Sequence, residues 1–195
     1  LSEVMNFPAV LKKDPEITAK IRSDLKHGKV IDGHAPGLMG ADLAEYARMG
    51  ISTDHETCTY EEGMERLSLG LKLLIREGSA ARNFSVLSPF MEDRTDLCML
   101  CSDDKHPDDL VKGHINDLVK QAVAKGINVM NALRCACVNP VRHYRLPVGL
   151  LQTGDPADFR DFDDLFAAFS AQVRHMLDVK VRGNQVIERV YATRM

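Results

Sequence analysis

Residues 32–37 read Asp32-Gly33-His34-Ala35-Pro36-Gly37, and they place a histidine directly after a short β-favouring run. Two later stretches repeat this arrangement with a histidine or an aspartate. They are Thr53-Asp54-His55-Glu56 and Cys101-Ser102-Asp103-Asp104-Lys105-His106-Pro107. One ligand from the end of each of several successive strands is how a parallel barrel builds a metal site at its C-terminal face. The ordered series His, His, Asp therefore predicts an α/β fold with a metal centre.

The rest of the chain alternates short apolar runs with amphipathic stretches, which is typical of α/β architecture. Strands are predicted over 29–32, 51–54, 71–75 and 96–101, with a fifth at the extreme N-terminus. Helices are predicted over 15–27, 41–49, 60–68, 80–91, 107–125, 128–137 and 139–144. The last part is expected to contain a turn-rich segment over 149–159, an amphipathic helix from 161 to about 177 and a strand over 179–191.

Composition limits the classes of partner. The chain has 195 residues, 45% of them hydrophobic, which is enough to bury one core. A net charge of −3 gives no electrostatic case for nucleic acid or an anionic membrane. No apolar run approaches the roughly 20 residues of a membrane span, and no signal peptide is recognisable. We therefore expect a cytoplasmic protein without a nucleic-acid or membrane partner. Because the first residue is leucine, we also expect a piece of a longer chain or a processed chain.

The five cysteines form an odd set that suits a reducing compartment. Cys98 and Cys101 make a C-x-x-C, a spacing that also occurs in redox and zinc-ribbon sites. However, Cys98 lies inside a strand-like run, and no second C-x-x-C completes a structural zinc site. We expect both thiols to act as small buried hydrophobes.

The residue types define the chemistry of the predicted centre. Neutral imidazoles suit zinc, iron or manganese, and carboxylates complete such a site. Asp103 is suited to accept a proton from water activated by the cation, and Glu56 is placed as a second proton shuttle. Asp104 is suited to hydrogen-bond a heterocycle or orient a ligand. Alternatives remain for single segments: Asp103-Asp104 also suits a helix N-cap, and His114 lies in the middle of a predicted helix as a structural or supporting residue.

The strand count indicates an incomplete barrel. A closed (β/α)8 barrel needs eight strands and typically about 250 residues, whereas four or five strands are predicted here. The chain is therefore expected to form the second half of a barrel. An open parallel half-sheet leaves edges and apolar faces uncovered, so we expect the isolated piece to be only marginally stable unless another chain covers them.

At these motifs the sequence resembles the adenine deaminases of the amidohydrolase superfamily of metal-dependent hydrolases. The resemblance runs from residue 1 to about residue 158. The stretch 76–82 and the loop 102–107 are its most diagnostic parts. The matching stretches are Glu3-Val4-Met5-Asn6-Phe7-Pro8, Gly33-His34-Ala35-Pro36-Gly37, Ser52-Thr53-Asp54-His55-Glu56, Arg76-Glu77-Gly78-Ser79-Ala80-Ala81-Arg82-Asn83, Cys101-Ser102-Asp103-Asp104-Lys105-His106-Pro107 and Gly113-His114-Ile115.

The resemblance implies a partial TIM-like barrel, about strands 4–8, over residues 1–147. Residues 148–195 would return toward a small β-domain through a short helix and a β extension. Glu3 would be the metal ligand after the fourth strand, and His34 and His55 those after the fifth and sixth. Asp103, after the eighth, would be ligand and general base. The metal would be divalent: manganese or iron, with zinc as an alternative.

The implied reaction is hydrolytic deamination of adenine to hypoxanthine and ammonia by metal-activated water, as part of a longer enzyme of purine salvage. Glu56 would be a proton donor or substrate contact. Arg76, Glu77, Ser79 and Asp104 would bind the purine. A homo-oligomer is expected.

The sequence also departs from the family. It lacks the first-strand His-x-His pair and the flanking domains, and the similarity fades after Phe159. Two alternatives therefore stay open. One is another amidohydrolase acting on a cyclic amide or amidine, and the other is an inactive half-barrel that needs a partner.

Overall fold

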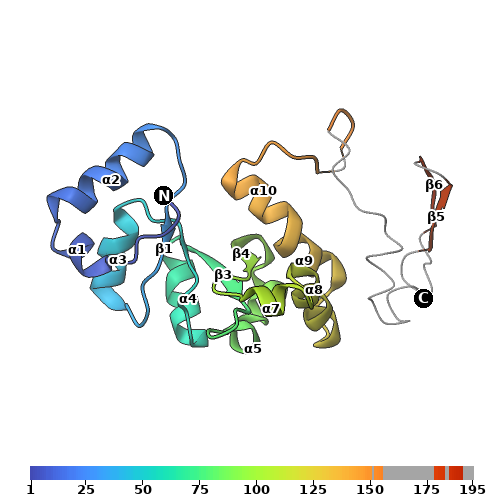
Figure 1. Ribbon diagram of the computed structural model, residues 1–195, viewed down its shortest axis with the longest axis horizontal. Coiled ribbons are helices and arrows are strands. Elements are labelled where there is room, and N and C mark those ends of the chain that lie inside the picture. Colours follow the sequence, from blue (N-terminus) through green and yellow to red (C-terminus); the bar gives the residue numbers. More distant parts are fainter. Residues whose placement is uncertain (151, 156–177, 183–184, 191–195) are drawn as a thin grey trace. The chain divides into compact units, whose positions relative to one another are not determined.

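Four parallel strands, hydrogen-bonded in chain order, carry the fold in the computed structural model of the protein (Figure 1). They are β1 (Asp32–Gly33), β2 (Thr53–Asp54), β3 (Lys72–Arg76) and β4 (Cys98–Cys101). Each of the four overlaps a predicted strand, although β1 shares only Asp32 with the predicted strand 29–32. The expected fifth strand at the N-terminus is reduced to a single parallel bridge between Val4 and Gly33, beside β1.

The structure describes residues 1–150, 152–155, 178–182 and 185–190. They belong to two compact units, 1–147 and 148–195. In the second unit, β5 (Asp178–Arg182) and β6 (Gln185–Val190) pair as antiparallel strands. The single strand predicted over 179–191 is therefore wrong and is replaced by two strands. The helix predicted over 161–177 lies outside the described residues.

Helices connect the strands of the first unit, as parallel pairing requires. Figure 1 shows α1–α3 gathered near β1, and α8–α10 near β4. Within the described residues, no helix combines the length and the apolar character that crossing a membrane requires. The helices are α1 (Phe7–Leu11), α2 (Pro15–Lys26), α3 (Gly40–Arg48), α4 (Tyr60–Ser68), α5 (Phe84–Leu87), α6 (Phe90–Asp93), α7 (Pro107–Leu110), α8 (Ile115–Ala124), α9 (Val129–Leu133), the π-helix Arg134–Val138 and α10 (Asn139–Tyr144).

Local sequence explains where the helices begin. Asp14 accepts hydrogen bonds from the amides of Glu16 and Ile17 and so caps α2, whose first residue is proline. Thr59 and Glu62 form a capping box at the start of α4. Both starts agree with the predicted helices.

Two predicted helices are broken in the structure. The helix expected over 80–91 is divided into α5 and α6 around Pro89, which lacks an amide hydrogen. The helix expected over 107–125 is divided into α7 and α8, and His114 occupies the N-cap position of α8 instead of a helix interior. The N-cap position of α7 belongs to His106, so the capping alternative for Asp103-Asp104 is wrong.

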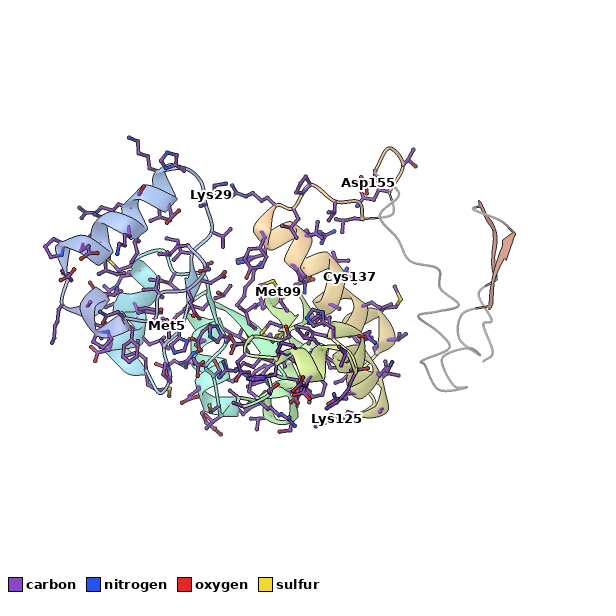
Figure 2. All side chains as sticks on the ribbon, viewed as in Figure 1. Met5, Lys29, Met99, Lys125, Cys137 and Asp155 are labelled. Carbon is purple, nitrogen blue, oxygen red and sulfur yellow. The ribbon has the colours of Figure 1, made fainter. Side chains whose placement is uncertain are left out.

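The core lies between the sheet and the helices. Buried Leu73 and Ile75 on β3 and Met99 on β4 belong to it, and Figure 2 labels Met99 on its strand. β1 and β2 approach closely at Gly33. A Cβ at this position would meet the carbonyl oxygen of Thr53 and lie 2.8 Å from Cγ2 of Ile51. Glycine at this position therefore lets β1 sit against β2, one residue before His34.

The cysteine prediction is confirmed for Cys98, which is fully buried. Burial raises the pKa of its thiol, so it stays protonated. Cys101 is partly exposed, and all five cysteines are free thiols.

Candidate active site

Three side chains that the sequence predicts as metal ligands converge at the carboxyl ends of the first strands. His34 follows β1, His55 follows β2, and Glu3 precedes the residue that bridges to β1. His34 Nδ1 lies 3.1 Å from His55 Nε2. The Glu3 Oε2 atom lies 3.2 Å from His55 Nε2 and 3.5 Å from His34 Nδ1. The structure therefore brings these three side chains within 3.5 Å of one another.

The spacing of these atoms fits one divalent cation. Zinc binds histidine and carboxylate ligands at about 2.0–2.2 Å, which places neighbouring ligand atoms about 3.0–3.5 Å apart. Two imidazoles and a carboxylate are suited to zinc, iron or manganese. Among the described residues, Glu3, His34 and His55 are the group of ligand side chains close enough to hold such an ion.

Asp103 lies at the edge of this cluster, just after β4. Its Oδ1 atom is 3.8 Å from His55 Nε2, and about 29% of its side chain is exposed. The backbone of Asp103 has φ +42°, in the left-handed region that non-glycine residues seldom adopt. Strained backbone of this kind persists where the surrounding structure imposes it, often at functional sites.

The carboxylates of Asp103 and Glu56 both contact the guanidinium group of Arg76. Nη1 of Arg76, at the end of β3, lies 2.6 Å from Asp103 Oδ2 and 2.8 Å from Glu56 Oε1. Burial by itself would lower the pKa of the Arg76 guanidinium, but the charges of Glu56 and Asp103 outweigh it and raise this pKa. Arg76 therefore stays positively charged, and it draws both acids toward the cluster. Glu56 Oε1 also lies 3.4 Å from His34 Nδ1.

Two of the residues predicted to bind substrate, Ser79 and Asp104, form hydrogen bonds within the chain. The Asp104 carboxylate accepts hydrogen bonds from the amides of Ala80 and Ala81. The Ser79 hydroxyl donates to Asp109 Oδ2 and accepts from the amide of His106. These contacts tie the loop after β3 to the loop after β4.

Glu77 lies in the same loop, with its carboxylate 3.8 Å from Arg82 Nε. His114 Nε2 lies 3.0 Å from the Ser102 hydroxyl, next to Asp103. A supporting position for His114 was one of the alternatives open from the sequence.

A cavity of about 270 Å³ opens beside the cluster. Its apolar part is formed by Leu74 and Cys101, and its polar side by Ser2, Glu3, Asp32, His55 and Asp103. Burial raises the pKa of the Cys101 thiol to about 12, so this wall is uncharged. Small-molecule sites combine apolar walls with a few convergent polar groups in this way.

Sequence reasoning missed the residues that hold these loops in place. Asn83 is buried, accepts the amide hydrogen of Arg76 and donates to the carbonyl oxygen of His55. Tyr46, Asp54 and Arg66 are also buried beneath the cluster. Asp54 lies inside the motif 53–56, but its neighbours in the sequence give no signal for Arg66, its partner twelve residues away in α4.

Comparison with known proteins agrees with this arrangement. The family model described as "Amidohydrolase family" matches residues 1–183. An adenine deaminase of Methanosarcina mazei is 56% identical over 166 residues, which cover 85% of this chain and 30% of the relative. Adenine deaminases of Sulfurovum sp. and Salinibacter ruber are 55% and 53% identical, over 85% and 86% of this chain and 31% of each relative.

The chain thus spans about 30% of the length of these curated relatives. The family match covers most of the chain, including every strand of the four-stranded sheet and every residue of the cluster. The chain belongs to the amidohydrolase family.

Proposed function

We propose that the protein, as part of a longer enzyme, catalyses hydrolytic deamination of adenine to hypoxanthine and ammonia. The observation that carries this proposal is the convergence of Glu3, His34 and His55 within hydrogen-bonding distance of one another, with Asp103 at their edge. The relatives that share more than half of their aligned residues with this chain are adenine deaminases. The substrate would be a small purine.

The same relationship supports a finer proposal for the fold. Amidohydrolases imply a TIM-like barrel, and the parallel sheet β1–β4 would supply strands 5–8, with the Val4 bridge marking strand 4. Residues 1–147 would then be the second half of the barrel, and residues 148–195 would lead toward a small β-domain. We further expect a cytoplasmic homo-oligomer.

Glu3, His34 and His55 would hold a divalent metal, with Asp103 as a fourth ligand. Membership of the family implies such an ion. We expect manganese or iron, with zinc as the alternative. When bound, the ion would lower the pKa of water toward neutrality and polarise the reacting bond.

The chain's own residues would move the protons. Water supplies the oxygen at C6 of adenine, one of its protons leaves with ammonia, and the other stays on the neighbouring ring nitrogen. Asp103 would take one proton from water and deliver it to the departing amino group. Glu56, which contacts the same Nη1 atom of Arg76, would take the second proton of that water and pass it to the neighbouring ring nitrogen. Because Arg76 lies within 2.8 Å of both acids, it would keep them oriented toward the same reacting atoms.

Arg76, Glu77, Ser79 and Asp104 were expected to bind the purine. In this proposal Arg76 does not contact the purine; it orients the carboxylates of Asp103 and Glu56. Ser79 and Asp104 would shape the substrate side of the cavity by joining the loops after β3 and β4. A direct contact of Glu77 or Asp104 with the purine stays a prediction.

The test is conversion of adenine to hypoxanthine by the purified protein, supplied with Mn²⁺, Fe²⁺ or Zn²⁺ in separate preparations. Metal-dependent hypoxanthine production that disappears in Asp103→Asn is expected. A panel of cyclic amides and amidines tests the alternative amidohydrolase reaction. Metal binding without turnover of any of these compounds would overturn the proposal and favour a half-barrel that needs a partner.

A further inference from the structure

A buried hydroxyl joins two of the three ligand-bearing segments. Tyr46 extends from α3, and its side chain is fully enclosed. Its hydroxyl donates a hydrogen bond to the carbonyl oxygen of Val4 at 2.9 Å and accepts one from the amide of His34 at 3.1 Å. Val4 follows Glu3 directly. One oxygen atom therefore fixes the backbone of the Glu3 segment against that of His34.

A buried ion pair joins the His34 segment to the His55 segment. Asp54, which precedes His55, accepts a hydrogen bond from the amide of Ala35 at 3.0 Å. Arg66 on α4 donates to the carbonyl oxygen of Ala35 at 2.8 Å, and its Nε lies 2.7 Å from Asp54 Oδ2. Ala35 follows His34. The amide and the carbonyl oxygen of Ala35 are thus both held by the Asp54–Arg66 pair, whose side chains are fully buried.

We propose that Tyr46, Asp54 and Arg66 are positioning residues that set the spacing of Glu3, His34 and His55, and so determine how tightly the centre holds its metal. The inference rests on the proposed function, because it presupposes a metal centre at these three ligands. None of the three positioning residues belongs to the ligand cluster. Each hydrogen-bonds a backbone group of a ligand residue or of its chain neighbour.

Physical chemistry favours this role over a merely stabilising one. A buried ion pair is weak evidence for stability, because desolvation of the two charges can exceed their attraction. A divalent ion requires ligand atoms within a few tenths of an ångström of their bonding distances. Three segments that come from separate strands need a common reference to meet that requirement, and this network provides one.

Tyr46→Phe tests the first joint, because it removes a single oxygen and keeps the ring. Metal-free protein is titrated with Mn²⁺, and free Mn²⁺ is measured by electron paramagnetic resonance well below the melting temperature. We expect affinity to fall about tenfold or more, the range seen when residues that support metal ligands are removed. Tyr60→Phe is the matched control, since its partly exposed ring stacks on Phe90 away from the centre.

Arg66→Lys tests the second joint, since a lysine keeps the charge but lacks the planar fork that reaches Asp54 and Ala35 together. The absorption spectrum of the Co²⁺-loaded protein reports whether the ligands have moved, independently of stability. Weaker Mn²⁺ binding and an altered Co²⁺ spectrum in Tyr46→Phe, with Tyr60→Phe unchanged, support the inference. If Arg66→Lys does not fold, Tyr46→Phe alone decides.

Unchanged affinity and spectrum in a folded Tyr46→Phe protein would overturn the inference while leaving the proposed function intact. Failure of the unsubstituted protein to bind Mn²⁺, Co²⁺ or Zn²⁺ would instead overturn the metal centre itself, and with it this inference. The two failures are therefore distinguishable in the same titration.

Discussion

Arg76 faces two carboxylates from a position where only 8% of its side chain is exposed. Its Nε atom is buried and makes no hydrogen bond within the described residues, so its contacts are concentrated on Nη1. Glu56 is only 13% exposed. The charge of Arg76 is therefore poorly screened by solvent, and its removal leaves two acids facing each other.

Replacing Arg76 with methionine should lower the free energy of unfolding by about 3–5 kcal/mol, the usual cost of breaking a buried ion pair on one side. Urea unfolding of the metal-free protein measures this change. Arg48→Met, which removes an exposed cation paired with Glu45, is the control and should cost at most about 1 kcal/mol. Equal losses in the two variants would contradict the account of Arg76.

Asp103→Asn keeps the shape of the side chain but removes its ability to accept a proton. If Asp103 is the general base, kcat for adenine should fall about 10²–10⁴-fold. Steady-state kinetics on the metal-loaded protein measure the change. Asp108→Asn, on the exposed surface of α7, should retain full activity. Retained kcat in Asp103→Asn would assign the proton transfer to another residue.

At the scale of single residues, the sequence indicates the candidate site residues more readily than the buried residues that hold them in place. His34, His55 and Asp103 stand out because each follows a short apolar or β-favouring run. Tyr46 does not, because its two partners are Val4 and the amide of His34, which only the folded chain brings near. The loop contacts of Asp104 and Ser79 were unpredictable for the same reason.

At the scale of elements, α4 is the helix that brings Arg66 under the site. It packs against the sheet and α6 at Gly63, where an added Cβ would lie 2.6 Å from Cε2 of Phe90 and 3.4 Å from Cδ1 of Leu73. The glycine therefore allows a close approach that a side chain would prevent.

Gly63→Ala should destabilise the protein by about 1–3 kcal/mol through overpacking, although alanine is intrinsically the better helix former. Thermal and urea unfolding measure the change. Gly63→Ala combined with Phe90→Leu makes room for the new methyl group. The double variant should be more stable than the two separate losses would predict. A stabilising effect of Gly63→Ala alone would show that α4 is free to move away from α6.

The prediction of β3 succeeded because a parallel strand covered on both faces is a short, nearly continuous apolar run, as in residues 71–75. Helix prediction failed where periodicity continued across a break. The apolar spacing runs from Leu110 through Leu118, but the chain turns at Gly113, where a side chain would collide with the Asp117 carboxylate. The spacing of apolar residues indicates which face of a helix is buried, but it does not indicate a close contact such as the one between Gly113 and Asp117.

At the scale of the whole molecule, α10 links the end of the first unit to its first strands. Tyr144 on this helix donates a hydrogen bond to Asp32, and His143 Nε2 lies 3.4 Å from the Ser52 hydroxyl. Burial, reinforced by the charge of Lys72, lowers the pKa of His143 below its ordinary value of 6.5, although Asp32 acts in the opposite direction.

This shift predicts a pH dependence of stability. Since the pKa of His143 is lower in the folded state than in the unfolded state, the unfolded chain binds more protons as pH falls through 6.5. The contribution of His143 to the free energy of unfolding should therefore be fully present above that pH and decrease as pH falls through 6.5. Urea unfolding is measured across this pH range for the unsubstituted protein and for His143→Gln. The difference between the two curves gives the contribution of His143 to the free energy of unfolding. Parallel curves for the two proteins would contradict it.

The location of the bound metal tests the central claim most directly. Anomalous diffraction from Mn²⁺-loaded crystals, recorded near the manganese absorption edge, places the ion without reference to activity. The account predicts a strong anomalous peak bounded by Glu3, His34 and His55, with Asp103 beside it. Crystals in which the strongest peak lies elsewhere, with these three side chains free of metal, would contradict it.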